Sequence, residues 1–238
     1  MLTLASAGCR GDGTTKEKRA LLAAAPEGML RLANAAADEG APLVFGVHGR
    51  GDTPESFSDV FHAYRTPALF YFPRAPTPHG EGFTWFDLGP GMDEATVGRN
   101  VAAAADALHA RIQAIARGRR YLVVGFSQGG FLAYALAARF PGELACALPI
   151  AGALPTPLRP EPRARALPAV FAFHGVADPL VDVAWDRASA NSFRAAGGEV
   201  VLREYPGLRH RTTPALRAEL YAALDACLAR LGGSSTRP

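Results

Sequence analysis

The chain has 238 residues, of which 49% are hydrophobic and 20% charged, and its formal net charge is +3. This length and composition are typical of one globular domain and exclude a disordered or fibrous chain. The densest basic cluster, Arg117, Arg119 and Arg120, lies where a helix is expected to end, so its charges complement the helix dipole and do not indicate a nucleic-acid partner.

The first residues of the chain allow two interpretations. An apolar, small-residue stretch over 1–8 precedes Cys9, as at the end of a bacterial lipoprotein signal, but it is shorter than a signal and no basic residue precedes it. We expect 1–20 to be a flexible segment before a single domain over 21–231, with a flexible tail over 232–238. We expect a cytoplasmic location; the alternative, if the true start lies upstream, is a lipid anchor on Cys9. No stretch approaches the roughly 18 apolar residues of a membrane span.

From residue 41 onward, short apolar runs alternate with helical patterns. Continuous apolar runs are typical of strands buried on both faces of a parallel sheet. Their alternation with helices predicts an α/β fold: a doubly wound, mostly parallel sheet with helices on both faces. The runs are Leu43–Val47, 68–72, Tyr121–Phe126, Leu144–Ile150, 169–173 and 199–204, and the helical patterns are 55–64, 93–116, 130–139, 184–196 and 214–231. The segment 21–38 stays open between a helix broken at Pro26 and a short strand at Met29–Ala33.

Two segments have neither pattern. Residues 73–92 combine Pro and Gly with Phe83, Trp85 and Phe86, and we expect them to form a wall over a site at the carboxyl ends of the strands. Residues 155–168 contain five prolines and are too short to fold as a cap domain. We therefore expect no cap domain and an open site.

The three cysteines are not expected to form a disulfide framework or a zinc site, because their number is odd and no two are close in sequence. Cys146 and Cys227 lie in apolar runs, which favours small buried core residues. No metal site is expected.

Residues 125–129 fit the motif G-x-S-x-G, with Ser127 at its centre. In α/β hydrolases this motif forms a sharp strand-to-helix turn that exposes the serine Oγ, and flanking glycines relieve the crowding. The motif alone is weak, but an apolar run precedes it and a helical pattern follows. We therefore predict Ser127 as the nucleophile of a serine hydrolase of the α/β-hydrolase type.

The base and acid are expected after the serine, in the order Ser, Asp or Glu, His. Among the histidines, only His210 stands in the required place; His174 comes before it and is expected to pack in a loop after a strand. The predicted acid is Asp178, which would fix the tautomer of His210, and Asp182 is the competing acid. The histidines that precede Ser127 are His48, His62, His79 and His109.

Acyl transfer also needs backbone N–H groups that stabilise the developing oxyanion. One is expected from Gln128, the residue after the nucleophile, and the other from Arg50, in the Gly-rich loop after Leu43–Val47. A phosphate cradle is not expected at that loop, since it contains neither the P-loop lysine nor G-x-G-x-x-G.

Together these motifs resemble the phospholipase/carboxylesterase family, which includes acyl-protein thioesterases and small bacterial carboxylesterases. The resemblance covers about residues 41–230 and rests on HGxGDT from His48, WFD from Trp85, GFSQGG from Gly125 and HGxxDPxV from His174. It implies an α/β-hydrolase fold, the triad Ser127, Asp178 and His210, oxyanion donors at Arg50 and Gln128, and no metal or organic cofactor. It also implies that the segment 85–87 lies beside the acyl site.

The chain departs from the family at Arg50, where an apolar residue is usual. The arginine argues against an apolar channel for the acyl chain and favours an anionic substrate. The expected substrates are small-molecule or lipid-like esters or thioesters of short to medium acyl length. Acyl-protein thioesterase or lysophospholipase activity is the first alternative, and amidase, peptidase or perhydrolase activity the second, since the same triad serves all of them. The sequence leaves a homodimer open.

Overall fold

The computed structural model describes residues 27–33, 37–89, 91–161 and 166–232. The expectations for the segment 1–20, for Cys9 and for the tail after 232 lie outside these ranges.

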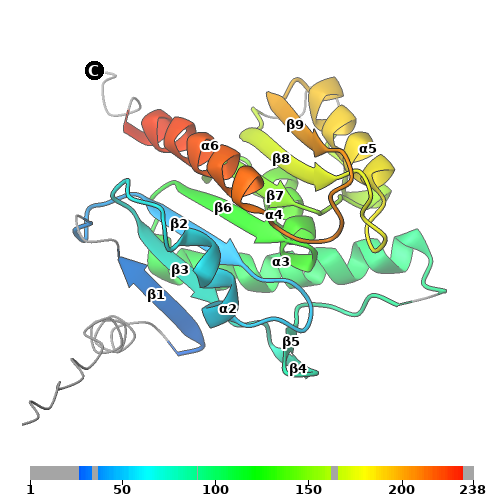
Figure 1. Cartoon of the computed structure of the whole chain (residues 1–238), viewed down its shortest axis with the longest axis horizontal. Coiled ribbons are helices and arrows are strands. Elements are labelled where there is room, and N and C mark those ends of the chain that lie inside the picture. Colours follow the sequence, from blue (N-terminus) through cyan, green and yellow to red (C-terminus); the bar gives the residue numbers. More distant parts are fainter. Residues whose placement is uncertain (1–26, 34–36, 90, 162–165, 233–238) are drawn as a thin grey trace, which may run out of the picture.

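A seven-stranded sheet forms the centre of the molecule, with strand order β1-β3-β2-β6-β7-β8-β9 (Figure 1). All neighbouring strands are parallel except the edge pair β1 and β3. The mostly parallel sheet confirms the predicted fold class. The strands are β1 (Met29–Ala33), β2 (Leu43–Val47), β3 (Leu69–Pro73), β6 (Tyr121–Phe126), β7 (Leu144–Ile150), β8 (Ala169–Gly175) and β9 (Val200–Tyr205).

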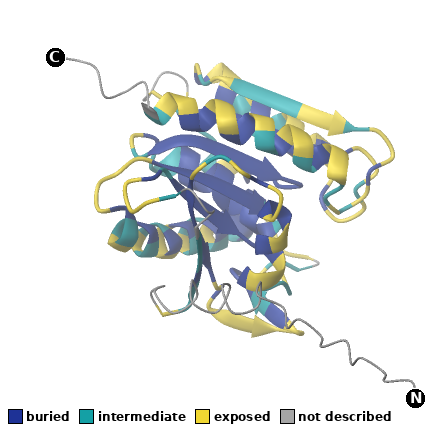
Figure 2. Ribbon diagram, turned by 60° about the vertical axis from the view of Figure 1, so that its left-hand side comes forward, coloured by how far each residue is buried: buried dark blue, intermediate teal, exposed yellow. Residues whose placement is uncertain are grey.

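Helices cover both faces of the sheet, and successive residues of each inner strand pack against opposite helix layers. In β2, Phe45 belongs to the apolar cluster under α3, α4 and α5, whereas Val44 belongs to the cluster under α2, η1 and α6. This explains why the inner strands are continuously apolar, and Figure 2 shows them buried between helices with exposed outer sides. The helices are α2 (Pro54–Ser58), η1 (Asp59–Phe61), α3 (Glu94–Ala116), α4 (Gln128–Arg139), η2 (Thr156–Leu158), α5 (Val183–Ala195) and α6 (Pro214–Gly232).

Helix α3 illustrates how the sequence sets element ends. Asp93 caps its first turn by accepting a hydrogen bond from Thr96 N at 2.8 Å, as short acidic side chains do at helix N-termini. The helix ends at Arg117, which adopts a left-handed conformation with φ of 49° and is followed by Gly118.

The segment left open before residue 41 contains the second of its two alternatives, a strand at Met29–Ala33, which is β1 and runs antiparallel to β3. Two other segments differ from the sequence-based expectations. The expected helix over 55–64 is divided into α2 and η1. The segment 73–92 contains a small hairpin, β4 (Thr77–His79) with β5 (Gly82–Thr84), whose strands of three residues are too short to leave a periodic pattern.

The expectation for the cysteines was wrong. Cys146 on β7 and Cys227 on α6 form a disulfide across 81 residues of sequence. Both side chains are buried in the same apolar cluster, so the prediction of core positions holds. Spacing in the sequence could not indicate the bond, because only the packing of α6 on β7 brings the two sulfurs together.

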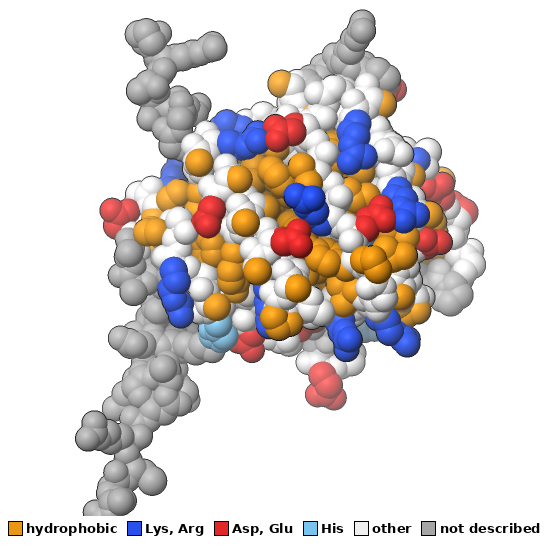
Figure 3. All heavy atoms as spheres, turned by 45° about the horizontal axis from the view of Figure 1, so that its top comes forward, with side chains coloured by type: hydrophobic (Ala, Val, Ile, Leu, Met, Phe, Trp, Pro, Cys, Tyr) orange, Lys and Arg blue, Asp and Glu red, His pale blue; other side chains and the backbone are white. Residues whose placement is uncertain are grey.

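Among the described residues, no helix has the length and apolar character needed to cross a membrane. On the face shown in Figure 3, acidic and basic side chains are interspersed and do not gather into a patch of one sign.

Candidate active site

Ser127 lies at the turn between β6 and α4, with φ of 55° and ψ of −117°. Such a backbone is strained for any residue with a Cβ, and the packing around the turn holds it there. A Cβ on Gly125 would lie 2.0 Å from the carbonyl oxygen of Gly129, and a Cβ on Gly129 would lie 2.0 Å from the carbonyl oxygen of Val47. The two glycines of the motif are therefore required by close backbone contacts.

Asp178 and His210 meet beside this turn, on the loops that follow β8 and β9. His210 Nδ1 lies 2.7 Å from Asp178 Oδ2. The other oxygen, Oδ1, accepts hydrogen bonds from Leu180 N at 2.9 Å and Val181 N at 3.0 Å. Although burial raises the pKa of Asp178, the Val181 N–H and His210 lower it more, so its pKa lies below the ordinary value. An ionised Asp178 can only accept, so His210 donates from Nδ1 and its Nε2 is left to act as a base.

The ring of Phe126, the residue before the serine, packs on the His210 ring with centroids 4.8 Å apart. This contact places the histidine next to the end of β6. Within the described ranges, the Ser127 hydroxyl has no hydrogen bond to His210, a contact that often tightens only in the complex with substrate.

Asp182, the competing acid, has a different partner. It caps α5 by accepting a hydrogen bond from Ala184 N at 2.8 Å. A capping carboxylate at the start of α5 has a structural task, whereas the carboxylate of Asp178 contacts the histidine.

Gln128 is the first residue of α4, where backbone N–H groups have no acceptor within the helix. Its buried side chain binds the segment around β5. The amide oxygen accepts from Thr84 Oγ1 and Trp85 N, each at 3.0 Å, and the amide nitrogen donates to Phe86 O at 2.7 Å. These bonds connect that segment to the turn of the serine.

The loop that carries Arg50 passes directly by the serine, since a Cβ on Gly49 would lie 3.4 Å from Ser127 Cβ. The buried side chain of His48 fixes the conformation of this loop. Its Nε2 accepts from Ala75 N at 3.1 Å, so its proton is on Nδ1, which donates to Gly49 O at 2.7 Å. Burial lowers the pKa of His48, in keeping with a neutral ring. The Arg50 guanidinium donates to Leu88 O at 2.7 Å.

The three aromatic residues expected as a wall lie differently from the expectation. Trp85 and Phe86 are each only 6% exposed. Trp85 Nε1 donates to His48 O at 2.9 Å, and Phe86 packs on Phe131. Phe83 is half-buried on the hairpin, with the Arg74 guanidinium over its ring. Trp85 supports the loop of Arg50 through its bond to His48 O, and Phe83 through its backbone oxygen, which accepts from Gly51 N at 2.8 Å.

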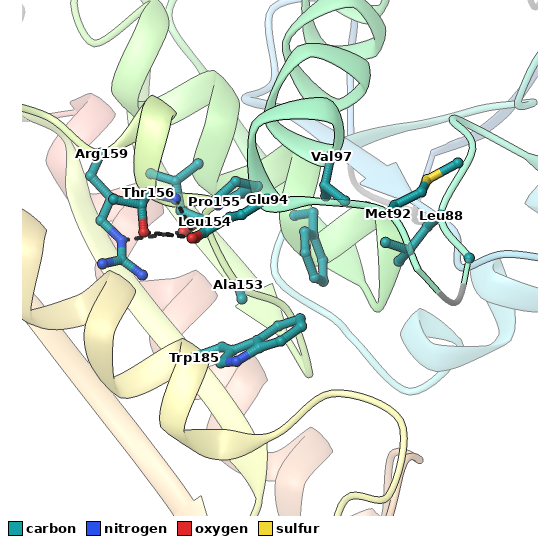
Figure 4. Close-up of a pocket in the computed structure, with 12 residues that line it drawn as sticks. Leu88, Met92, Glu94, Val97, Ala153, Leu154, Pro155, Thr156, Arg159 and Trp185 are labelled. Carbon is teal, nitrogen blue, oxygen red and sulfur yellow. Dashed lines mark hydrogen bonds between the residues drawn. The ribbon is translucent and has the colours of Figure 1, made fainter.

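An apolar cavity of about 410 Å³ lies beyond them (Figure 4). Two of its lining residues connect it to the serine turn and to the loop of Arg50. Phe131 lies one turn of α4 after Gln128, and the carbonyl oxygen of Leu88 accepts from the Arg50 guanidinium. Sequence reasoning missed this cavity because its walls come from four separate segments. They are Leu88, Gly89, Met92, Glu94, Val97, Phe131, Ala153, Leu154, Pro155, Thr156, Arg159 and Trp185.

His174 also differs from its expected role as a loop residue. It lies in β8, fully buried, and forms an ion pair with Asp186 of α5. The sequence contains no signal for this pair, since the two residues are twelve positions apart on a strand and a helix.

The chain is similar to known esterases in sequence and in structure. The sequence profile of the phospholipase/carboxylesterase family matches residues 31–228. Two rice proteins (Oryza sativa subsp. japonica) named as probable carboxylesterases are similar to it. One is 29% identical over 79% of this chain and 77% of its own, and the other is 31% identical over 74% and 83%.

Solved structures with the same fold include esterase PE8, with a TM-score of 0.73 and 22% identity over 83% of this chain and 97% of that one. Acyl-protein thioesterase 2 of Zea mays has a TM-score of 0.68 and 22% identity over 84% and 98% of the two chains. At this level of identity, the likeness establishes the α/β-hydrolase fold alone.

Proposed function

The chain belongs to the phospholipase/carboxylesterase family of ester hydrolases, and on this premise we propose that it cleaves ester or thioester bonds through an acyl-enzyme on Ser127. The observation that carries the proposal is the 2.7 Å contact between His210 Nδ1 and Asp178 Oδ2 beside the strained turn of the serine. A histidine base oriented by a carboxylate and placed near a serine is the arrangement that activates a serine nucleophile.

In the proposed reaction, Ser127 Oγ attacks the acyl carbonyl while His210 Nε2 takes the hydroxyl proton. Asp178 stabilises the imidazolium that forms, and the N–H groups of Arg50 and Gln128 donate to the oxyanion. Collapse of the tetrahedral intermediate expels the alcohol or thiol, which receives the proton from His210. Water, deprotonated by the same histidine, then attacks the acyl-enzyme and releases the acid.

The cavity beside the loop of Arg50 is the proposed site of the acyl chain. Its lining is mainly apolar, and its volume of about 410 Å³ is at the small end for ligand sites. Short to medium acyl chains of small-molecule or lipid-like substrates fit this size. The proposed effect on substrate binding of the three aromatic residues Phe83, Trp85 and Phe86 is indirect. Their segment fixes the loop that carries Arg50. Initial rates on p-nitrophenyl esters from C4 to C16 test this assignment, and a clear preference for C16 without detergent would refute it.

The disulfide between Cys146 and Cys227 indicates the kind of cellular compartment in which the protein works. Such bonds persist in oxidising compartments and are rare in a reducing cytoplasm. The Cys146–Cys227 bond therefore weighs against the expected cytoplasmic location and favours export.

Replacing the nucleophile tests the catalytic proposal. Ser127→Ala should lower kcat by about 10⁴–10⁶, with an unchanged Tm, and should abolish labelling by a fluorophosphonate probe as seen by intact mass. Ser192→Ala is the matched control, because the Ser192 hydroxyl donates to Ser189 O at 2.7 Å within α5; it should keep full activity and labelling. A Ser127→Ala enzyme with a tenth of the wild-type rate would disprove the assignment.

A further inference from the structure

A second pair of histidine and carboxylate lies directly behind Asp178. His174 Nδ1 is 2.7 Å from Asp186 Oδ2, and its Nε2 is 2.9 Å from Val181 O. The side chains of His174 and Asp186 are both 0% exposed. The catalytic proposal gives this pair no part, although a buried ionisable pair is costly to maintain.

The hydrogen bonds define the charge of the pair. A carbonyl oxygen and a carboxylate oxygen both accept, so both ring nitrogens of His174 donate and the ring is an imidazolium. Burial lowers the pKa of His174, but Asp186, the Val181 carbonyl and Asp178 together raise it more, so the net pKa is above the ordinary value. Burial raises the pKa of Asp186, and hydrogen bonds from His174 and the Tyr134 hydroxyl oppose this effect.

His174 touches Asp178 in two ways. Its Nε2 lies 3.7 Å from Asp178 Oδ2, the oxygen that accepts from His210. Its hydrogen bond to Val181 O also fixes the residue whose N–H donates to Asp178 Oδ1 at 3.0 Å. Both carboxylate oxygens of Asp178 are therefore constrained by groups that His174 contacts or holds.

We propose that His174, held by Asp186, is a positioning residue for the catalytic acid: it fixes the orientation of Asp178 and sets the electrostatic potential at His210. The proposal rests on the triad proposed above. The pair is electrically asymmetric, because the cation faces Asp178 and the anion lies on the far side of the ring. The cation offsets part of the negative charge that Asp178 presents to His210.

The other charged groups near the pair are few and are themselves paired. Glu204 of β9 is the cross-strand partner of His174, and Arg187 of α5 binds it through two nitrogens. Tyr134 of α4 faces Asp186 as a neutral donor, since burial raises its pKa well above the ordinary value. The unbalanced influence on Asp178 therefore comes from His174.

Asp186→Asn tests the electrostatic part. The amide can accept from Tyr134 and donate to His174 Nδ1, while His174 Nε2 still donates to Val181 O, so every contact can persist with a neutral ring. On the acid side of its pH profile (the acid limb), kcat/KM for p-nitrophenyl butyrate falls to half of its maximum at a certain pH. Removing the nearer positive charge should raise that pH by roughly half a unit. The value of kcat on the plateau should change less than threefold. An unmoved limb would overturn the proposal.

His174→Gln tests the positional part. It removes the ring that holds Val181, so kcat on the plateau should fall by tenfold or more, whereas KM changes little. Asp186→Asn, which keeps the ring, should retain most of that rate. If both variants only lower Tm and leave kcat and the acid limb unchanged, His174 is a structural residue.

His109→Gln is the matched control. His109 Nε2 pairs with Glu143 Oε2 at 2.7 Å in another histidine–carboxylate pair, away from the serine turn on α3. This variant should leave the pH profile unchanged. A second readout needs no variant: ¹⁵N NMR of histidine side chains should show His174 protonated on both nitrogens at pH 7, and a neutral ring would refute the proposal.

The two proposals fail in distinguishable ways. If the catalytic proposal is wrong, Ser127→Ala retains activity. If only the positioning proposal is wrong, Ser127→Ala is inactive and the Asp186→Asn profile overlays that of the wild type.

Discussion

At the scale of single residues, the two oxygens of Asp178 have separate partners. Oδ1 is held by backbone N–H groups of its own loop, and Oδ2 faces His210. Pro179 follows and restricts Asp178 towards extended backbone geometry. The carboxylate is thus fixed before it meets the histidine, and a fixed carboxylate can impose one tautomer on the imidazole.

This separation predicts different outcomes at the two neighbouring acids. Asp178→Asn should lower kcat by about 10²–10⁴, because an amide can leave His210 in the wrong tautomer. Asp182→Asn should leave kcat nearly unchanged, because asparagine caps a helix about as well as aspartate. Steady-state kinetics on a p-nitrophenyl ester distinguish the two. The reverse pattern would assign the acid to Asp182.

The pKa values of His48 and His174, which are both fully buried, should be shifted in opposite directions. Burial lowers the pKa of His48, so the folded state resists a proton that the unfolded chain binds, and His48 reduces stability as pH falls below about 6.5. The pKa of His174 is raised by Asp186 against the effect of burial. Its contribution is present below about 6.5 and is lost as pH rises through the raised value. In ¹⁵N NMR at pH 6, His48 should be neutral with Nδ1 protonated, and His174 should be charged; matching titrations of the two would contradict this.

At the scale of elements, the close approach of α4 to the loop after β7 depends on a pair of glycines. A Cβ on Gly152 would lie 2.5 Å from the carbonyl carbon of Gly130, and a Cβ on Gly130 would lie 2.9 Å from Gly152 Cα. These contacts set the distance between the sheet and the helix that begins after Ser127, and so they position Ser127.

Gly152→Ala should therefore lower the free energy of unfolding by about 1–3 kcal/mol through overpacking, and it should lower kcat because α4 must shift. Gly142→Ala is the control, since a Cβ there meets nothing within 4 Å, and its effect should stay within about 0.5 kcal/mol. Urea unfolding monitored by tryptophan fluorescence measures both. Equal midpoints for the two variants would show that the Gly130–Gly152 contact is not tight.

The elements best predicted from sequence are those buried on both faces. Leu43–Val47, Tyr121–Phe126 and Leu144–Ile150 have the same bounds in the sequence pattern and in the sheet, because complete burial requires an unbroken apolar run. Met29–Ala33 could not be assigned, since an edge strand with Arg31 in its middle satisfies neither a strand nor a helix pattern clearly.

The rules of chain order and local turns were enough to propose Ser127, His210 and Asp178, with Asp182 as the competing acid, and the structure brings Asp178 and His210 into contact. The rules do not reach contacts made by packing between distant segments. The cavity behind Leu88, the inward turn of Trp85 and the pair of His174 with Asp186 all arise from such packing.

At the scale of the whole molecule, the disulfide links the two structural layers. Cys146 is on a central strand and Cys227 on the last helix, which covers one face of the sheet. The bond adds a covalent link to the apolar packing and the polar contacts, such as those of Asp225 and Tyr221, that hold α6. It therefore restricts separation of α6 from the sheet in the unfolded chain.

Reduction should therefore destabilise the protein by about 2–4 kcal/mol, the usual range for a disulfide that closes a long loop. Intact mass under non-reducing conditions should show one reactive thiol per chain, since two of the three cysteines are paired. Urea unfolding with and without reductant measures the stability difference. Three reactive thiols in the folded protein would exclude the bond.

The same bond closes a ring of backbone that runs from residue 146 to residue 227 and contains both Asp178 and His210, with Ser127 outside it. A protease that cuts once inside the ring leaves every piece covalently attached, because the path through the two sulfurs bypasses the cut. A cut before residue 146 has no such bypass and leaves two fragments held by packing alone. If the nick falls between residues 146 and 227, where Asp178 and His210 lie, the nicked protein should migrate as one band on a denaturing gel until reductant is added. If it falls before residue 146, where Ser127 lies, two bands should appear without reductant.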